Sequence, residues 1–442
     1  MSKVEPRILR GFRDYLPEEM VPRQRMLAAI ESHFQSYGFP PLQTPALEYA
    51  EILLGKYGDE GQKLLYRFRD EGDRDVALRY DLTVPLARVV AQYPELPRPF
   101  RRYQIAPVWR AERPARGRFR EFMQCDADIA GSADFTADAE ILTLGAGLLQ
   151  RLGVERFQMR LNHRLILRGI TGAAGIAPAD EPKVLGTVDK LPKIGPDETR
   201  RLLREQNGLA AEQAERLLEA LGWTGEPREI LARVERAFTT GPAPEGAKIL
   251  GQILTLLEAA GLKSQVALDL SIARGLDYYT GSIYETFLLD LPGFGSVMSG
   301  GRYDQLVGTF SKEEIPAVGI SLGIDRLFSG LQELKLLPTT RGAVTEVLVT
   351  VFDAAGAAAA FGAAAALRTA GIACELYPAF HKLGKQFKYA ERRGARWVVV
   401  AGPDETARGE VTVKTLETGE QTAVPLAGLG AWLRERRGTD TK

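Results

Sequence analysis

The chain has 442 residues, which is too long for one compact core, so we expect two or three domains. Lys plus Arg and Asp plus Glu both number 57, so no global basic field indicates a nucleic-acid partner. A nucleic-acid contact must therefore come from local patches. The hydrophobic fraction of 45% and the charged fraction of 26% are ordinary for a soluble globular protein.

Two cysteines, Cys125 and Cys374, lie far apart, which argues against a disulfide framework and against a cysteine-based zinc site. The segment Met1 to Gly11 has no apolar leader region, and no run approaches the roughly 18 apolar residues that a membrane span needs. We expect a soluble, unprocessed protein of the reducing cytoplasm, with no membrane partner.

The first predicted element is a helix over Pro22 to Tyr37, which Gly38 and the following prolines end. An extended segment follows over Leu42 to Leu47. Between Asp75 and Gly131 short extended runs alternate with turns, which predicts antiparallel strands. The clearest two are Phe100 to Trp109 and Phe119 to Ile129.

From Ile176 to Leu262 the sequence becomes helical and charged, as is typical of an insertion. Extended runs then resume over Val266 to Leu289 and Val297 to Tyr303, and a glycine-rich piece, Val318 to Phe328, leads into a helix. We therefore predict an α+β domain formed by residues 1–175 and 263–335, with an antiparallel sheet flanked by helices and a helical insertion at 176–262.

A linker over Leu337 to Gly342 precedes strands that alternate with helices, which predicts a small α/β domain over residues 343–442. The predicted strands and helices in this domain are, in order, Val347 to Phe352, Ala354 to Ala370, Ile372 to Tyr377, Lys382 to Arg393 and Trp397 to Ala401.

The segment Val108 to Gly131 carries the strongest charge pattern. Alternate residues of a strand share a face, so Arg110 and Glu112 are expected on one face. After a basic turn, Arg118 and Arg120 are expected on one face of the returning strand, with Phe119 on the other. Arginines grouped in this way suit phosphate oxygens.

Farther along the same strand, Gln124, Asp126 and Asp128 alternate with apolar residues, so one face is polar. A binding site is one interpretation. An antiparallel strand with one solvated face is the other, and the pattern alone leaves both open.

The stretch Arg274 to Thr280 places a cation, a carboxylate and two phenols beside a glycine. Such a cluster suits a polar small molecule that carries negative charge. A strand edge with ordinary aromatic packing remains the alternative for this stretch taken alone.

These segments together resemble the histidyl-tRNA synthetase family of class II aminoacyl-tRNA synthetases. The similar stretches include Gly11 to Pro17, Leu78 to Pro85, Trp109 to Glu112, Arg274 to Gly281, Ser299 to Asp304 and Gly319 to Arg326. The C-terminal part resembles the family's anticodon-binding domain through Leu383 to Ala390 and Gly409 to Lys414.

The resemblance implies a role for each matched residue. The implied catalytic cations, at the α-phosphate of ATP, are Arg110 and Arg274. The implied ATP-binding residues are Arg110, Glu112, Arg118 and Arg326. The implied histidine-binding residues are Asp81, Thr83, Gln124, Asp128, Tyr278 and Tyr279. The implied tRNA-binding residues are Arg113, Arg116, Lys385 and Lys388.

The resemblance further implies that ATP and L-histidine form histidyl-adenylate, from which histidine passes to tRNA(His). It implies Mg²⁺ with ATP, no metal ligand that we can assign among the side chains, and a homodimer. Asp81 and Asp128 stand where many bacterial members carry Glu, which leaves the detailed pocket geometry open.

Two other functions remain as alternatives. One is a catalytically silent, histidine-binding regulatory paralogue that partners ATP phosphoribosyltransferase. The retained arginines and the extra C-terminal domain argue against it. The other is a class II ligase for threonine, proline or glycine, against which the string Arg274 to Gly281 and the absence of a zinc set argue.

Overall fold

The computed structural model describes residues 4–57, 61–114, 118–273, 278–337 and 344–437. Contacts divide the chain into two compact units. The first comprises Met1–Arg13 with Ala28–Leu336, and the second comprises Asp14–Leu27 with Leu337–Lys442. The separation of the insertion at 176–262 from a catalytic domain stays a prediction.

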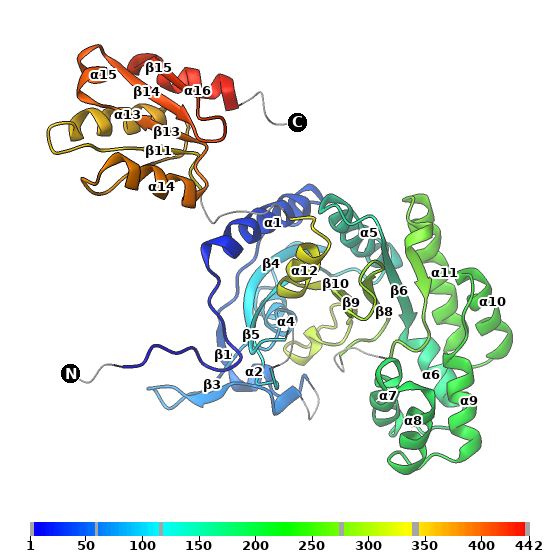
Figure 1. The fold of residues 1–442 in the computed structure, drawn as a ribbon. Helices are drawn as coiled ribbons and strands as arrows, with labels where there is room; N and C mark the ends of the chain where they lie inside the picture. Colours follow the sequence, from blue (N-terminus) through cyan, green and yellow to red (C-terminus); the bar gives the residue numbers. More distant parts are fainter. Residues whose placement is uncertain (1–3, 58–60, 115–117, 274–277, 338–343, 438–442) are drawn as a thin grey trace. The chain divides into compact units, whose positions relative to one another are not determined.

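The first unit is built on a seven-stranded sheet (Figure 1). Neighbouring strands are antiparallel, except that β6 and β7 are parallel. In sheet order the strands are β4 (Phe100–Trp109), β5 (Glu121–Ala130), β10 (Ala317–Gly323), β9 (Met298–Arg302), β8 (Ser282–Leu288), β6 (Phe157–His163) and β7 (Val266–Leu268). The predicted α+β class with a mainly antiparallel sheet is confirmed.

The β4–β5 hairpin sets the two faces of this sheet. Along β5, Cys125, Ala127 and Ile129 are buried on one face, and the alternating Gln124 and Asp126 lie on the other. Helix α5 (Phe135–Arg151) contacts β5, β9 and β10. One face therefore enters a helix-covered core, and the other is left for polar side chains.

Further elements complete the first unit. A three-stranded antiparallel sheet has the order β1 (Leu47–Tyr49), β3 (Asp75–Leu78), β2 (Arg67–Arg69). Helices α1 (Pro17–Ser36), α2 (Ala50–Leu53), α4 (Thr83–Gln92), α6 (Arg164–Ala173) and α12 (Ile324–Glu333) accompany the two sheets, and α1 spans parts of both units.

Two sequence predictions in this region need correction. Helix α1 begins at Pro17, at the first helical position, where proline is tolerated, and it continues through Pro22. Residues Thr83 to Gln92 form helix α4 where short extended runs were expected. The backbone N–H of Val84 in its first turn donates to the carboxylate of Asp81, 3.1 Å away, which satisfies a free helix-end donor.

The segment predicted as a helical insertion is helical in the structure. Its helices are α7 (Glu181–Val188), α8 (Leu191–Glu205), α9 (Ala211–Leu221), α10 (Pro227–Ala237) and α11 (Ala243–Ala259). A non-helical residue, Gly195, breaks α8 near its start. Helix α11 contacts α5, α6 and β6, so this segment packs against the strand that precedes it.

The second unit has a five-stranded sheet in the order β12 (Cys374–Leu376), β11 (Val347–Val349), β13 (Trp397–Val400), β14 (Glu410–Thr415), β15 (Gln421–Pro425). Helices α13 (Ala357–Thr369), α14 (Leu383–Arg393), α15 (Pro403–Ala407) and α16 (Leu429–Arg437) accompany it. The predicted C-terminal α/β fold is confirmed, and β14, β15 and α16 extend it beyond the elements that the sequence predicted.

Within the described ranges, no helix combines the length and the apolar character that crossing a bilayer requires.

Candidate active site

A cavity of about 510 Å³ opens on the polar face of the seven-stranded sheet. Strands β5, β8, β9 and β10, the connection after β4, the start of α4 and the first turn of α12 all contribute to its wall. Sequence-predicted site residues that line it are Asp81, Thr83, Arg110, Glu112, Arg118, Gln124, Tyr278, Tyr279 and Arg326. Residues far apart in the chain therefore meet in one cavity.

Arg110 directly follows the last residue of β4. Its guanidinium carbon lies 4.3 Å from the centre of the Tyr80 ring and 5.1 Å from that of Phe122. Its Nε donates to the carbonyl oxygen of Tyr80 at 3.1 Å. Stacking between rings leaves the remaining N–H groups of the guanidinium for an anion in the cavity. A fixed cation of this kind suits a phosphate.

The residues before β5 differ from the strand-parity prediction. Arg118 and Phe119 both line the cavity, whereas Arg120 donates to the carbonyl oxygens of Glu112 and Arg10. Regular pairing in β5 starts only at Glu121, so residues 118–120 precede the strand. Their side chains therefore need not alternate between the two faces of the sheet. Likewise, β4 ends at Trp109, and Arg110 and Glu112 lie in the connection after it.

Arg326 lies in the first turn of α12, and its Nη1 donates to the carbonyl oxygen of Ser296 at 3.0 Å. The preceding Asp325 accepts from the backbone N–H of Met123 at 2.8 Å and from Arg13 at 3.2 Å. Burial raises the pKa of the Asp325 carboxyl, and these hydrogen bonds oppose that rise. The start of α12 is thus tied to β5, which fixes the position of Arg326.

Asp81 is 2% exposed and is surrounded by donors. Its carboxylate accepts from the Tyr57 hydroxyl at 3.0 Å and from the Tyr278 hydroxyl at 3.4 Å, besides the helix-end N–H of Val84. Burial raises the pKa of Asp81, and the hydrogen bonds together with Arg110 oppose that rise. The site therefore holds a carboxylate in fixed orientation at the start of α4.

Asp128 is 3% exposed, and it is not among the described residues that line the cavity. Its carboxylate lies 2.7 Å from Arg102 and accepts from the Tyr303 hydroxyl at 2.6 Å. Burial raises its pKa, and Arg102 opposes the rise. The implied role of Asp128 in an imidazole pocket stays a prediction, with the carboxylate beneath the cavity wall.

Two glycines make room for these side chains. A Cβ on Gly319, opposite Asp128 in the β10–β5 pairing, would lie 1.8 Å from the Asp128 carboxylate. A Cβ on Gly301 would lie 2.9 Å from the Tyr279 ring. Only glycine leaves these approaches open. Gly319 and Gly301 thus leave room for the Asp128 carboxylate and the Tyr279 ring on the polar face of the sheet.

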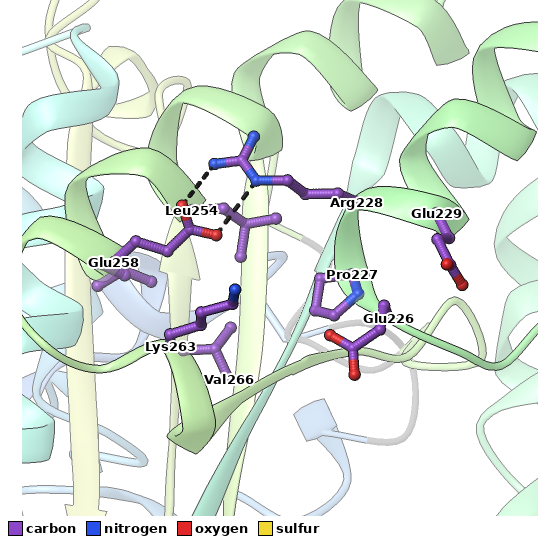
Figure 2. A pocket seen from close by; sticks show the side chains of 9 residues that line it. Glu226, Pro227, Arg228, Glu229, Leu254, Glu258, Lys263 and Val266 are labelled. Atoms are coloured by element: carbon purple, nitrogen blue, oxygen red, sulfur yellow. Dashed lines mark hydrogen bonds and ion pairs between the residues drawn. The ribbon is translucent and has the colours of Figure 1, made fainter.

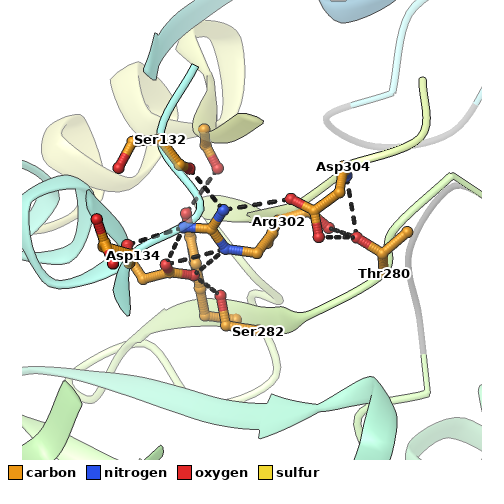
Figure 3. Close-up of polar contacts among 9 residues, drawn as sticks. Ser132, Asp134, Thr280, Ser282, Arg302 and Asp304 are labelled. Atoms are coloured by element: carbon orange, nitrogen blue, oxygen red, sulfur yellow. Dashed lines mark hydrogen bonds and ion pairs between the residues drawn. The ribbon is translucent and has the colours of Figure 1, made fainter. Parts of the chain in front are cut away.

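The stretch after Tyr279 is anchored by Arg302 of β9 (Figure 3). The carbonyl oxygen of Arg302 accepts from the Thr280 backbone N–H at 2.8 Å. The Arg302 guanidinium donates to the carboxylates of Asp138 in α5 and of Asp304. The Thr280 hydroxyl also donates to Asp304 at 2.8 Å. This network links β9, α5 and the segment that carries the two tyrosines.

Sequence reasoning assigned no role to several residues that support the site: Tyr57, Arg102, Asp126, Arg302, Tyr303 and Ser321. A signal existed for some of them. Arg302 and Tyr303 belong to a stretch noted for its resemblance, and Arg102 alternates with Gln104 on β4. No local pattern marks Tyr57, since its partner Asp81 is known only from the fold.

Four tRNA contacts were implied by resemblance, and the three that the structure describes are not among the residues that line the cavity. Arg113 is exposed in the connection after β4, and Lys385 and Lys388 are exposed on α14 in the second unit. Arg116, like the catalytic candidate Arg274, lies outside the described residues. The aromatic neighbours Phe387 and Tyr389 of α14 are half-buried and pack against a core cluster.

A second, smaller cavity of about 270 Å³ lies between α10, α11 and the start of β7 (Figure 2). Arg228 forms two hydrogen bonds with Glu258 on its wall, at 3.1 and 2.8 Å. Lys263 is exposed at its edge. None of the implied site residues that the structure describes lines it.

Comparison with known proteins agrees with the geometry. A family model for histidyl-tRNA synthetase matches residues 11–327, and one for an anticodon binding domain matches residues 346–436. A histidine–tRNA ligase of Rhodopirellula baltica is 44% identical over 95% of this chain and 96% of its own length. One of Aeropyrum pernix is 43% identical over 96% of this chain and 97% of its own length.

Among solved structures, a histidyl-tRNA synthetase from Nostoc has a TM-score of 0.85 and 31% identity, covering 98% of this chain and all of its own. An ATP phosphoribosyltransferase regulatory subunit/histidyl-tRNA synthetase from Bacillus halodurans has a TM-score of 0.72 at 22% identity, which shows a shared fold alone. The family models, the relatives of nearly full length and the arrangement of the cavity lead to one conclusion: the chain belongs to the histidyl-tRNA synthetase family.

Proposed function

We propose that this chain ligates L-histidine to tRNA(His) with ATP, through a histidyl-adenylate intermediate. The observation that carries the proposal is a single cavity lined by both cations and hydrogen-bond acceptors. Arg110, Arg118 and Arg326 line it as cations, and Asp81 and Gln124 line it as acceptors. Cations suit the phosphates of ATP, and acceptors suit the ammonium group of an amino acid.

Activation begins with both substrates in this cavity. Arg110 holds the α-phosphate, Glu112 orients the adenine end, and Arg118 and Arg326 hold the outer phosphates. The histidine carboxylate attacks the α-phosphorus in line and pyrophosphate leaves. Arg274 stabilises the charge that develops on the α-phosphate, and a fixed donor of this type commonly contributes a few kcal/mol. No side-chain nucleophile is required.

The amino acid is recognised by hydrogen bonds at both of its ends. Asp81, Thr83 and Gln124 receive the α-ammonium group. The imidazole has one N–H donor and one acceptor, so it needs a partner on each side to be distinguished from an apolar isostere. Asp128 and Tyr279, with Tyr278 nearby, supply those partners in this proposal.

The second half-reaction takes place with tRNA bound. A terminal ribose hydroxyl attacks the carbonyl carbon of histidyl-adenylate, and AMP leaves. Arg113 and Arg116 approach the acceptor end, and Lys385 and Lys388 contact the anticodon region through phosphates. We propose that two copies of the chain form the working homodimer.

Mg²⁺ enters with ATP in this proposal and neutralises phosphate charge. In the part of the chain that the structure describes, no group of three or more His, Cys, Asp or Glu side chains could hold a metal ion. The phosphate oxygens of ATP are therefore the ligands that we propose for it.

Exchange of pyrophosphate into ATP, tested separately with each standard amino acid, examines the activation step directly. We expect exchange with histidine alone, followed by charging of total tRNA with histidine. Exchange with threonine, proline or glycine instead would replace the substrate assignment.

Histidine binding without exchange would support the regulatory paralogue. The retained arginines of the cavity and the match of residues 346–436 to an anticodon binding domain favour the ligase over that alternative.

A further inference from the structure

Tyr57 is a buried aromatic residue that the proposed chemistry does not use. It follows the short helix α2, is 5% exposed and is not among the described residues that line the cavity. It packs in one buried cluster with Leu53 of α2 and Val84 of α4. A Cβ on Gly61 would lie 2.5 Å from the Tyr57 Cβ, so only glycine permits this close approach. Close packing therefore fixes the place of the Tyr57 side chain.

The Tyr57 hydroxyl binds one oxygen of the Asp81 carboxylate. It donates to Oδ1 at 3.0 Å, and the backbone N–H of Val84 donates to the same oxygen at 3.1 Å. The Tyr278 hydroxyl donates to the other oxygen, Oδ2, at the longer distance of 3.4 Å. Burial and the neighbouring Asp81 raise the pKa of Tyr57 well above its usual value, so the hydroxyl keeps its proton. Two donors thus hold Oδ1, and Oδ2 keeps acceptor capacity for a further donor, because each carboxylate oxygen has two lone pairs.

The ring of Tyr57 contacts a second residue of the site, Tyr80. The two ring centres are 4.5 Å apart, and the ring planes differ by 36°. The same Tyr80 ring has its centre 4.3 Å from the guanidinium carbon of Arg110, whose Nε donates to the Tyr80 carbonyl oxygen. Tyr80 lines the cavity, whereas Tyr57 does not. Tyr57 therefore packs against the residue that holds Arg110 in place.

These two contacts belong to different substrate regions of the proposed site. Asp81 is the proposed partner of the α-ammonium group, and Arg110 is the proposed partner of the α-phosphate. We propose that Tyr57 is a positioning residue for both substrates: its hydroxyl orients Asp81 for the amino acid, and its ring supports the contact between Tyr80 and Arg110 for ATP. This inference rests on the proposed function, because it takes histidine and ATP as the ligands. The hydroxyl and the ring can be removed separately, so each half has its own test.

Tyr57→Phe removes the hydroxyl and keeps the ring. We expect histidine binding to weaken by about 10-fold, as for the loss of one hydrogen bond to a charged group. Binding of imidazolepropionate, the analogue that lacks the α-amino group, and of ATP with Mg²⁺ should stay unchanged. Titration calorimetry with the three ligands measures this, and in pyrophosphate exchange the KM for histidine should rise while the KM for ATP stays. A role in packing alone would not single out the amino group of the ligand.

Tyr57→Leu removes the ring as well. We expect ATP binding to weaken by about 3- to 10-fold in addition to the loss of histidine affinity, because Tyr80 loses its aromatic neighbour. Gly61→Ala is a second test that leaves both rings intact, since its new Cβ must displace the Tyr57 side chain, and it should also weaken both ligands. A melting curve of each variant confirms that the protein is folded under the conditions of the titration.

Tyr103→Phe is the matched control. Tyr103 is also 5% exposed, does not line the cavity, and its hydroxyl accepts from Gln35 of α1 at 3.2 Å. The variant loses a buried hydroxyl of the same kind, at a hydrogen bond that does not involve Asp81. All three ligands should bind as they do to the parent protein.

Unchanged histidine binding in Tyr57→Phe would overturn the role of the hydroxyl, and equal weakening of histidine and imidazolepropionate would overturn it as well. Equal ATP affinities in Tyr57→Leu and Tyr57→Phe, or an unchanged ATP affinity in Gly61→Ala, would overturn the role of the ring. Failure of the proposed ligase function has a different signature, since the parent protein itself would then show no histidine-dependent pyrophosphate exchange.

Discussion

The two large sheets of this molecule bury very different side chains. In the seven-stranded sheet, charged and amide side chains are buried within the strands, among them Arg102, Gln104, Asp126 and Asp128. In the five-stranded sheet, all residues of β13, namely Trp397 and three valines, are buried. A buried polar group near this second sheet, Gln386 of α14, has both ends of its carboxamide bonded to the backbone of Val351.

The difference follows from what each sheet has to do. An apolar sheet gains stability from burial alone, and the groups proposed to contact tRNA lie on the helix α14 beside it. A sheet that binds a polar ligand must keep charges in a dry wall, and each charge then needs a partner. The catalytic sheet therefore depends on its networks for folding, whereas the C-terminal sheet depends on packing.

The largest expected effect on stability is that of Arg102→Met. Arg102 is fully buried and compensates Asp128, so its removal leaves a buried carboxylate without its cation. We expect the free energy of unfolding to fall by about 3–5 kcal/mol, measured by urea titration. Arg101→Met, at a half-exposed ion pair with Glu140, should cost less than about 1 kcal/mol. Equal losses in the two variants would contradict the view that the catalytic sheet depends on its buried charges.

The chemistry should also depend on the proposed catalytic cation, Arg274, which lies outside the described residues. Arg274→Ala is expected to retain ATP and histidine binding but to slow adenylate formation by on the order of 10²–10³-fold, because the cation serves the transition state. Single-turnover formation of labelled adenylate measures the rate, and Arg69→Ala, an exposed arginine of β2, is the control. An unchanged rate in Arg274→Ala would remove its catalytic assignment.

Two fully buried valines, one in each sheet, allow a test of whether the two sheets support different activities. Val318 of β10 and Val399 of β13 are both fully buried. Each truncation to alanine should cost about 2–3 kcal/mol of stability through lost burial and a cavity. Val318→Ala should lower the temperature at which pyrophosphate exchange is lost. Val399→Ala should leave that temperature unchanged and lower the temperature at which tRNA charging is lost. Val318→Ala should lose both activities together, because charging requires the adenylate. Loss of pyrophosphate exchange together with charging in Val399→Ala would show that the sheets do not act separately.

A further expected effect concerns pH and a buried histidine of the polar sheet. His163 ends β6, and its Nδ1 accepts from the Leu165 N–H at the start of α6. Burial, together with Arg302 and Arg168, lowers its pKa from 6.5 to about 4. Between these values the unfolded chain binds a proton that the folded protein excludes, so this residue makes stability fall as the pH falls.

Replacing this residue by asparagine, as His163→Asn, keeps a helix-capping acceptor and removes the titration. The variant should therefore lose less thermal stability than the parent when the pH drops from 6.5 toward 4, the range between the two pKa values. The parent's own slope from this residue approaches about 1.4 kcal/mol per pH unit. Melting temperatures across this range measure the difference, and parallel curves for the two proteins would show that His163 is not the source.

Regular elements with strong patterns were predictable from sequence. The strand over Phe100–Trp109 was placed at its true ends, and the helix at Lys382 to Arg393 differs from α14 by one residue. Helix α4 was missed, because its buried residues occupy several faces and give no clear helical period. Strand parity was wrong at Arg118 to Arg120, because pairing in β5 starts after them.

The sequence by itself determined the family, the fold class and the polar groups along the hairpin and the tyrosine string. These follow from local order, since neighbours in the chain set the period of a strand and the charge of a turn. Only the tertiary structure decided which polar groups are partners. Tyr303 reaches Asp128 across 175 positions, and Ser321 meets Gln124 across 197. Such pairs depend on strand register and burial, and a buried charge finds its partner only when distant strands have paired.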